Sequence, residues 1–344
     1  MDDTNWVTLL AGNDRRGGTS AARTKGPDEL IWKATLPEGV RSSPVLHAGV
    51  LYVTCRDGRV YAFESRTGKE RWKFQAAAPV HSTPSISGDL ILFGCDDGAA
   101  YALDRTSGQL RWKAEGGGRI WTSPTVHGEL AYIGSTDGTF KAVDRSSGPT
   151  RWTRQLQGQI HSTAYVNDRL AYFGCSDGRI YALESASGRD AWVHETGDSV
   201  TASPAVVNGL VLVGSEDYFF YALDAASGRR QWRFETNLGI ASSPAVADGK
   251  VFVGSKDGYL YALALDGGKE VWKSAQLRTI TASPLAGDSI VCIQTFYGAT
   301  QAFDIKSGKA LWTANLGGSL QSTPIVTPEA VYLATYQGVV YALR

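Results

Sequence analysis

The sequence predicts an all-β protein, an eight-bladed β-propeller of four-stranded antiparallel blades whose ring is closed by the N-terminal strand. Three observations predict it: a tryptophan that recurs every forty residues, short alternating segments between glycine-containing turns, and incomplete repeats at the two ends that complement each other. A four-stranded repeat cannot bury both of its faces alone. Repeats of about forty to fifty residues solve this by packing side by side in a ring.

The tryptophan column keeps a strict register. It comprises Trp32, Trp72, Trp112, Trp152, Trp192, Trp232, Trp272 and Trp312. A Ser/Thr-Pro pair shares the period, with proline at 44, 84, 124, 204, 244, 284 and 324 and Ala164 in its place in one repeat. An uninterrupted period of this kind means that every repeat builds the same unit.

Four strands are expected in each repeat. In one repeat, residues 80–86, 90–95, 100–104 and 110–114 form short runs that include Val, Ile, Tyr and Phe. The segments between them contain Gly, Asp or Ser, which is typical of tight turns between antiparallel strands. No stretch has the periodicity of a helix.

The two ends of the chain are expected to complete one blade. The last repeat stops after its third strand at residue 344, whereas residues 29–35 carry a tryptophan strand with no three strands before it. Pairing them gives eight complete blades and leaves no unpaired sheet edge at the junction. We therefore predict a lead-in arm over residues 1–24 and a single propeller over residues 25–344, with residues 29–35 completing the last blade.

A second pattern accompanies the tryptophan. The spacing Ala-x-Asp/Glu-x-x-x-Gly-x-x-x-Trp resembles the tryptophan-docking motif of pyrroloquinoline-quinone-type (PQQ-type) propellers. It ends at Trp72, Trp112, Trp152, Trp192, Trp232 and Trp312, and Ala264 replaces the acid in the remaining repeat. The resemblance covers residues 25–344 and implies the architecture, because the tryptophan fills the gap between blades while the acid and the glycine shape a turn. It does not imply that PQQ is bound.

The resembled family includes quinoprotein dehydrogenases, lipoproteins similar to outer-membrane assembly factor B, and bacterial sensor domains. The dehydrogenases carry an adjacent cysteine pair, a calcium site and a catalytic Asp on long insertions. This sequence has no such pair and no insertion in any blade, so we predict no cofactor, neither PQQ nor calcium. The lipoproteins need an N-terminal cysteine, whereas the first cysteine here is Cys55, inside a predicted strand.

Composition narrows the classes of partner. Lys plus Arg and Asp plus Glu are 34 each, so no basic field exists to attract nucleic acid. No apolar run is long enough to span a membrane, and the N-terminus lacks the pattern of a signal peptide. Cys55, Cys95 and Cys175 share one column on separate blades, roughly 10 Å or more apart, and are expected to be free. These features favour a cytoplasmic monomer, with an exported mature form as the alternative.

Several motifs are expected to carry no chemistry. The string Gly174-Cys-Ser-Asp-Gly178 matches a hydrolase elbow, yet residues 94–98 and 134–138 are its counterparts and indicate a β-turn. His47, His127 and His194 are interpreted as surface or outer-strand residues. Lys141 and Gln301, which replace a tyrosine of the third strand, are interpreted as tolerated exceptions. No Cys-x-x-Cys or His-x3-His spacing predicts a metal site.

The informative column precedes the Ser/Thr-Pro signature. Around the ring it reads Arg41, His81, Trp121, His161, Thr201, Ala241, Thr281 and Gln321. The large polar or aromatic members fall on five consecutive blades and are expected at the mouth of the central channel. On the same face, turns between second and third strands carry aromatic residues at Tyr218, Phe296, Tyr297 and Tyr336. The implied pocket has a cationic, imidazole-bearing wall and an aromatic wall; the alternative is that these columns are unconstrained surface.

The sequence favours a non-catalytic binding or scaffold propeller whose funnel holds a small anionic or aromatic ligand or a peptide segment. The ligand-binding residues are predicted to be Arg41, His81, Trp121, His161, Gln321, Phe296, Tyr297 and Tyr336. The alternative is a cofactor-independent lyase, cyclase or isomerase. In that case His81 and His161 would be acid and base, Arg41 would stabilise a carboxylate or an enolate, and Trp121 would stack on the substrate.

Overall fold

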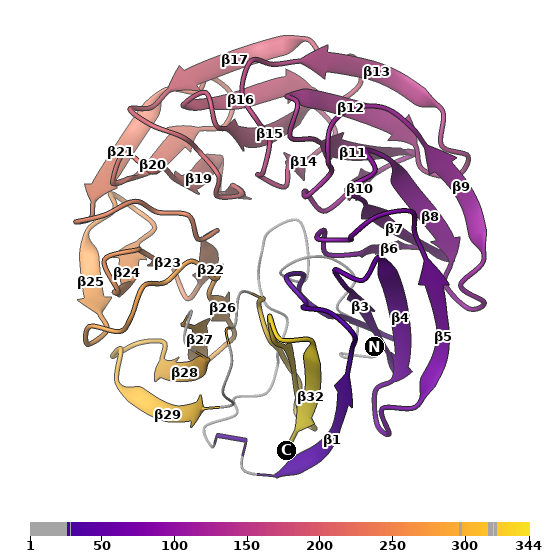
Figure 1. Cartoon of the computed structure of the whole chain (residues 1–344). Helices are drawn as coiled ribbons and strands as arrows, with labels where there is room; N and C mark the ends of the chain where they lie inside the picture. Colours follow the sequence, from indigo (N-terminus) through magenta and orange to yellow (C-terminus); the bar gives the residue numbers. More distant parts are fainter. Residues whose placement is uncertain (1–25, 28, 296–297, 316–318, 320–321) are drawn as a thin grey trace.

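The protein is a ring of eight blades around a central axis, as shown by a computed structural model (Figure 1). The structure describes residues 26–27, 29–295, 298–315, 319 and 322–344. Over these residues the strands form four-stranded antiparallel sheets and no helix is present. The predicted lead-in arm, Phe296, Tyr297 and Gln321 lie outside the described residues.

The first four blades follow one another along the chain. Blade one is β2 (Val45–His47), β3 (Val50–Thr54), β4 (Arg59–Glu64) and β5 (Glu70–Gln75). Blade two is β6 (Ser85–Ser87), β7 (Leu90–Gly94), β8 (Ala100–Asp104) and β9 (Leu110–Ala114). Blade three is β10 (Thr125–His127), β11 (Leu130–Gly134), β12 (Thr139–Asp144) and β13 (Thr150–Gln155). Blade four is β14 (Tyr165–Val166), β15 (Leu170–Cys175), β16 (Arg179–Glu184) and β17 (Asp190–Glu195).

The remaining blades repeat the pattern, and the last one draws on both ends of the chain. Blade five is β18 (Ala205–Val207), β19 (Leu210–Gly214), β20 (Phe219–Asp224) and β21 (Arg230–Glu235). Blade six is β22 (Ala245–Ala247), β23 (Lys250–Gly254), β24 (Leu260–Ala264) and β25 (Glu270–Lys273). Blade seven is β26 (Leu285–Ala286), β27 (Ile290–Gln294), β28 (Ala299–Asp304) and β29 (Ala310–Asn315). Blade eight is β30 (Ile325–Val326), β31 (Val331–Ala334), β32 (Val339–Leu343) and β1 (Leu30–Thr35).

The predicted closure by the N-terminal strand is confirmed. Strand β1 pairs antiparallel with β32, with Trp32 opposite Ala342, and the two lie side by side in Figure 1. The pairing continues beyond the strands, because the backbone N–H groups of Glu29 and Arg344 each donate to the other residue's carbonyl, at 3.0 and 2.7 Å. Blade eight therefore has the same four strands as its neighbours.

The docking tryptophans join each blade to the next. Trp72 of β5 donates its indole N–H to the carbonyl of Arg105 in blade two, at 3.1 Å, and its ring covers Gly108. A β-carbon on Gly108 would lie 2.6 Å from that ring, and the φ of Gly108 is +73°, so this position requires glycine. The same indole-to-carbonyl bond, 33 residues along the chain, is made by Trp32, Trp112, Trp152, Trp192, Trp232 and Trp272.

The acid and the glycine of the motif form the turn before the outer strand, as expected. In blade two, Asp104 accepts hydrogen bonds from the backbone and the hydroxyl of Ser107, and the N–H of Gly108 donates to the Asp104 carbonyl at 2.8 Å. Ala264 keeps the backbone bond, from Gly268 at 3.1 Å. The turn therefore survives without the carboxylate.

A second recurring contact fixes the turn between the second and third strands of five blades. In blade one the hydroxyl of Tyr61 donates to Asp57 at 2.6 Å, and the other carboxylate oxygen accepts the N–H of Arg59 at 2.9 Å. Burial, together with the neighbouring carboxylate, raises the pKa of Tyr61 to about 12. The same tyrosine-to-aspartate bond is made by Tyr101, Tyr181, Tyr221 and Tyr261.

The innermost strands are shorter than the sequence predicts. The run predicted over residues 80–86 becomes a strand only at Ser85–Ser87. The preceding Ser82 instead bonds through its hydroxyl to both the N–H and the carbonyl of Gly94, at 2.8 and 2.9 Å. Side-chain bonds and Pro84, which has no N–H, replace the ladder at this end of the strand.

A belt of six hydrogen bonds links successive blades at the Ser/Thr-Pro signature. The N–H of Ser43 donates to the hydroxyl of Thr83 on the next blade at 3.0 Å. The N–H of Thr323 donates to Ser43 at 2.8 Å and carries the belt across the closure. Equivalent bonds from one repeat to the next are made by the N–H groups of Ser123, Thr163, Ser203 and Ser243.

The cores lie between adjacent blades. One cluster, for example, packs Phe140 of blade three on Phe173 of blade four, with ring centroids 4.1 Å apart. All four cysteines are buried and unpaired, as expected. Burial raises the pKa of the Cys55 thiol to about 12, so these cysteines are apolar packing residues.

Candidate site at the channel mouth

Two sets of loops form one face of the ring. The Arg41 column lies on the loops that lead from an outermost strand to the next innermost strand, and the turns between second and third strands bind back to those loops. In blade two the N–H of Asp96 donates to the carbonyl of Pro79 at 3.0 Å, and in blade three Thr136 donates to Arg119 at 2.9 Å. These backbone bonds hold both variable columns at the same end of the channel.

The structure brings four of the predicted site residues together. Arg41 lies over the indole of Trp121, 5.6 Å from the ring centroid. The imidazoles of His81 and His161 flank the same indole, with centroid distances of 5.6 and 5.3 Å. Side chains from blades one to four therefore form one contact cluster, which we call the mouth cluster.

Asp96 orders the mouth cluster and was missed by the sequence analysis. Its two carboxylate oxygens lie 2.8 Å from the indole N–H of Trp121 and 3.6 Å from Nε2 of His81. The sequence signal was present, because the residue before the turn aspartate also varies around the ring. That second column reads Arg56, Asp96, Thr136, Ser176, Glu216, Lys256, Phe296 and Tyr336.

Both imidazoles of the mouth cluster are disposed to stay neutral. Burial holds the pKa of His81 below its ordinary value; Asp96 acts in the opposite direction, and Arg41, Arg56 and Arg119 lower it further. Burial and then Arg41 also lower the pKa of His161. Nδ1 of His81 is buried without a hydrogen-bond partner, whereas Nε2 of His161 lies 3.0 Å from the amide oxygen of Gln159.

Tyr336 joins the cationic side of the mouth. Its hydroxyl accepts a hydrogen bond from Arg56 at 3.0 Å, and the guanidinium lies 5.2 Å from its ring centroid. Of the three aromatic residues predicted to bind the ligand, only Tyr336 can be placed, because Phe296 and Tyr297 lie outside the described residues. Tyr218 is exposed and has a φ of +78°.

On the opposite side of the mouth, one lysine is neutralised by a glutamate of the neighbouring blade. Lys256 of blade six lies 2.7 and 2.8 Å from the two carboxylate oxygens of Glu216 in blade five. Thr201, Ala241 and Thr281 of the first column are small and partly buried there. On the side of blades one to three, by contrast, three guanidinium groups, those of Arg41, Arg56 and Arg119, act on His81.

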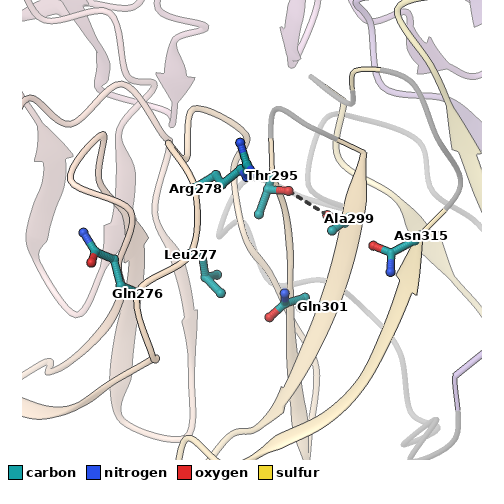
Figure 2. A pocket seen from close by; sticks show the side chains of 7 residues that line it. All are labelled: Gln276, Leu277, Arg278, Thr295, Ala299, Gln301 and Asn315. Atoms are coloured by element: carbon teal, nitrogen blue, oxygen red, sulfur yellow. Dashed lines mark hydrogen bonds between the residues drawn. The ribbon is translucent and has the colours of Figure 1, made fainter.

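A cavity of about 350 Å³ opens on the same face, between blades six and seven. Figure 2 shows the residues that line it, namely Gln276, Leu277, Arg278, Thr295, Ala299, Gln301 and Asn315. Gln301 stands where five other blades have the tyrosine that bonds the turn aspartate. The shorter side chain, interpreted from sequence as a tolerated exception, therefore lies in the wall of a cavity.

The other singled-out residues have structural roles. Lys141 is 4% exposed and donates to the carbonyls of Glu115 and Gly116 at 3.3 and 2.9 Å. Ser176 of the hydrolase-like string lies in a turn, where its hydroxyl accepts the N–H of Gln159 at 2.7 Å. His127 pairs with Asp168 at 2.8 Å.

His47 differs from expectation. It was interpreted as a surface residue, but it is partly buried and its Nδ1 is inaccessible and has no hydrogen-bond partner. Burial and then Arg105 of the next blade lower its pKa. This histidine therefore belongs to a polar site between blades one and two.

The described residues do not match the calcium site or the adjacent cysteine pair of the dehydrogenases. Among them, no group of three or more His, Cys, Asp and Glu side chains could hold a metal ion. The four cysteines lie singly in different blades. In the same part of the chain, no helix is long and apolar enough to cross a membrane.

Comparisons with known proteins agree on the fold. The family model described as outer membrane protein assembly factor BamB matches residues 8–193 and 177–344. BamB from Moraxella catarrhalis is similar with a TM-score of 0.81 and 20% identity, over 92% of this chain and 99% of that chain.

Two further solved structures are similar. The computationally designed Ika8 protein has a TM-score of 0.82 and 18% identity over 92% of this chain and 99% of its own. A europium-containing methanol dehydrogenase has a TM-score of 0.83 and 14% identity over 97% of this chain and 90% of its own. A search of curated proteins finds no significant match.

Proposed function

Since the chain belongs to the family described as outer membrane protein assembly factor BamB, we propose that it is a non-catalytic binding module that uses the mouth cluster to hold its ligand. The ligand carries an anionic group next to a flat aromatic or apolar group, either as a small molecule or within a peptide segment. The family's name describes an assembly factor, and a rigid ring that binds another molecule is consistent with such work.

One observation carries the proposal: the guanidinium of Arg41 lies over the indole of Trp121, and the imidazoles of His81 and His161 flank that indole. Three guanidinium groups act on His81 against one carboxylate, that of Asp96, so the local charge favours an anion. The bond from Trp121 to Asp96 fixes the indole, which supports a flat group without reordering. An arginine over an aromatic ring presents its donors at the ring edge.

The proposed ligand is tested with aromatic carboxylates, aromatic phosphates and acidic peptides that contain an aromatic residue. Arg41→Ala and Trp121→Ala should each weaken binding about tenfold or more, which is about 1.4 kcal/mol. Exposed Arg41 should change the free energy of unfolding by only about 0.5 kcal/mol. Thr281→Ala, on the opposite side of the mouth, is the matched control and should leave binding unchanged.

The same panel distinguishes binding from catalysis. If His81→Gln and His161→Gln keep affinity but abolish conversion of a bound compound, the lyase, cyclase or isomerase alternative replaces the binding module. Unchanged affinity in the Arg41 and Trp121 variants would instead move the site elsewhere on the ring. Native mass spectrometry of the purified protein would identify a ligand that co-purifies.

A further inference from the structure

A small cavity of about 140 Å³ lies between blades one and two, at the end of the ring opposite the mouth cluster. Strand β2 runs away from the mouth, so the β2–β3 turn and the β4–β5 turn lie at the other end. The cavity is lined by Ala48, Val50, Tyr52, Arg71, Trp72, Arg105 and Thr106. It is therefore separate from the site of the proposed function.

The guanidinium groups of Arg71 and Arg105 both line this cavity, and the carboxylates that pair with them lie at long distances. Arg71 lies 3.6 Å from Glu64, and Arg105 lies 3.8 Å from Asp89, whose side chain is 89% exposed. Burial raises the pKa of the Tyr52 hydroxyl, and the positive charges of Arg105 and Arg71 act in the opposite direction. Ion pairs this long and this exposed neutralise little charge, so the cavity keeps an excess of positive charge.

Two buried nitrogen atoms at this junction lack hydrogen-bond partners among the described residues. They are Nε of Arg105 and Nδ1 of His47, and Arg105 acts on the pKa of His47. An unsatisfied buried donor is rare in folded proteins unless a ligand, ion or water completes it. Nε of Arg105 always carries a hydrogen, so this arginine, which lines the cavity, lacks an acceptor there.

The next junction along the ring provides an internal comparison. There, Arg111 pairs with Asp104 at 2.6 Å. Arg145 bonds Ser87 at 3.0 Å and pairs with Glu129 at 3.2 Å. Leu92 stands at the position that Tyr52 occupies in blade one. Arg111 and Arg145 therefore have close partners within the protein at the junction of blades two and three. Their counterparts Arg71 and Arg105, at the junction of blades one and two, have only long ion pairs.

We propose that the cavity between blades one and two binds a phosphate group through Arg71 and Arg105, with the hydroxyls of Tyr52 and Thr106 as further donors. A guanidinium donates two parallel hydrogen bonds to a tetrahedral oxyanion. The volume of about 140 Å³ admits the phosphate group itself, so the rest of a phosphorylated molecule lies outside. Inorganic phosphate and a phosphate monoester share this chemistry.

Inorganic phosphate is the first probe, added to the full chain at constant ionic strength. Binding to the folded state should raise the melting temperature in proportion to RT ln(1 + [phosphate]/Kd) and broaden the ³¹P NMR line. Arg105→Gln and Arg71→Gln should each weaken phosphate binding at least tenfold. Arg145→Gln and Arg111→Gln, the matched positions one blade later, should leave it unchanged.

The controls separate this site from the mouth cluster and from general ionic effects. Arg41→Ala should retain the phosphate response, so this inference and the proposed function can fail independently. Arg105→Lys keeps a charge but loses the fork of donors, and should bind less tightly while staying folded. A phosphoserine peptide that binds more tightly than inorganic phosphate would identify a phosphorylated partner. Equal responses in wild type and both Gln variants, or an equal effect of chloride, would overturn the proposal.

Discussion

Each docking tryptophan combines apolar burial with one directed bond across a blade junction. Trp192 is 9% exposed, stacks near Tyr172 and donates to the carbonyl of Ala225 at 3.0 Å. Trp192→Ala should lower the free energy of unfolding by about 3–5 kcal/mol, because a large cavity opens between blades four and five. Trp192→Phe keeps a ring and should lose only about 1–2 kcal/mol, measured by urea denaturation. Equal losses in the two variants would contradict this division of roles.

Lys141 is a buried charge in a position where six other blades have tyrosine. Burial lowers its pKa, and its ammonium bonds the carbonyls of exposed Glu115 and Gly116, which water can also reach. Lys141→Tyr should restore the bond to Asp137 and raise the free energy of unfolding by about 1 kcal/mol. Chemical denaturation tests it, with Lys141→Phe as the control that lacks the hydroxyl. A Tyr variant no more stable than the Phe variant would refute the restored bond.

The histidines of the mouth cluster predict a direction of pH dependence. The folded-state pKa of His161 is lowered, by burial first and by Arg41 second. The unfolded chain therefore takes up the proton first, and stability present above about pH 6.5 is lost as the pH falls towards the folded pKa. His161→Gln should flatten this loss in urea denaturation between pH 7.5 and 5.5.

An NMR titration isolates the contribution of Arg41. The chain has five histidines, so the His161 signal can be assigned by its absence from the His161→Gln spectrum. Arg41→Ala should raise the pKa of His161 towards its ordinary value. No change would mean that burial alone sets it.

At the residue scale, the sequence located most of the mouth cluster but not its arrangement. The variable column gave Arg41, His81, Trp121 and His161, because departures from a strict repeat are visible without coordinates. The sequence did not identify Asp96 as a member of the mouth cluster, because an aspartate in a turn is ordinary and only its contact with Trp121 sets it apart. The orphaned atoms of His47 and Arg105 depend on side-chain geometry between two blades, which a repeat pattern does not encode.

At the scale of elements, turn chemistry made the strands predictable and side-chain bonds shifted their ends. The turns of blade two occur where Gly, Asp and Ser indicate them, and the strands between them match within a few residues. The innermost strand is the exception. There Ser82 bonds Gly94 with its hydroxyl, and Pro84 has no N–H for a ladder, so the regular strand starts later.

Strand β1 is predicted to be indispensable to the ring. Deleting residues 1–36 removes the outer strand of blade eight and exposes the edge of β32 together with the surface that Trp32 covers. An unpaired edge promotes association, so the truncated protein should form oligomers and melt at a lower temperature. Light scattering and thermal unfolding test this. A monomeric truncation with an unchanged melting temperature would contradict it.

At the scale of the whole molecule, the ring makes the position of the chain ends nearly arbitrary. Glu29 and Arg344 already exchange two backbone hydrogen bonds, so a short linker can join them. New ends between Ala226 and Ser227, in an exposed turn of blade five, interrupt no strand. This permutant should keep the fold and lose only a few degrees of melting temperature. New ends within β4, between Val60 and Tyr61, should prevent folding, as measured by circular dichroism; equal stability of both would refute the argument.

The belt of hydrogen bonds at the Ser/Thr-Pro signature holds neighbouring blades together without involving the side chains of the mouth cluster. Five of its six bonds join residues forty positions apart, and the sixth crosses from Thr323 back to Ser43. The spacing of the blades joined in this way is consequently set by one standard bond length, not by the side chains displayed beside it. Arg41 and Trp121 take no part in the belt, so replacing either should leave this spacing unchanged. The residues at the mouth can therefore differ from blade to blade without altering the frame that holds them.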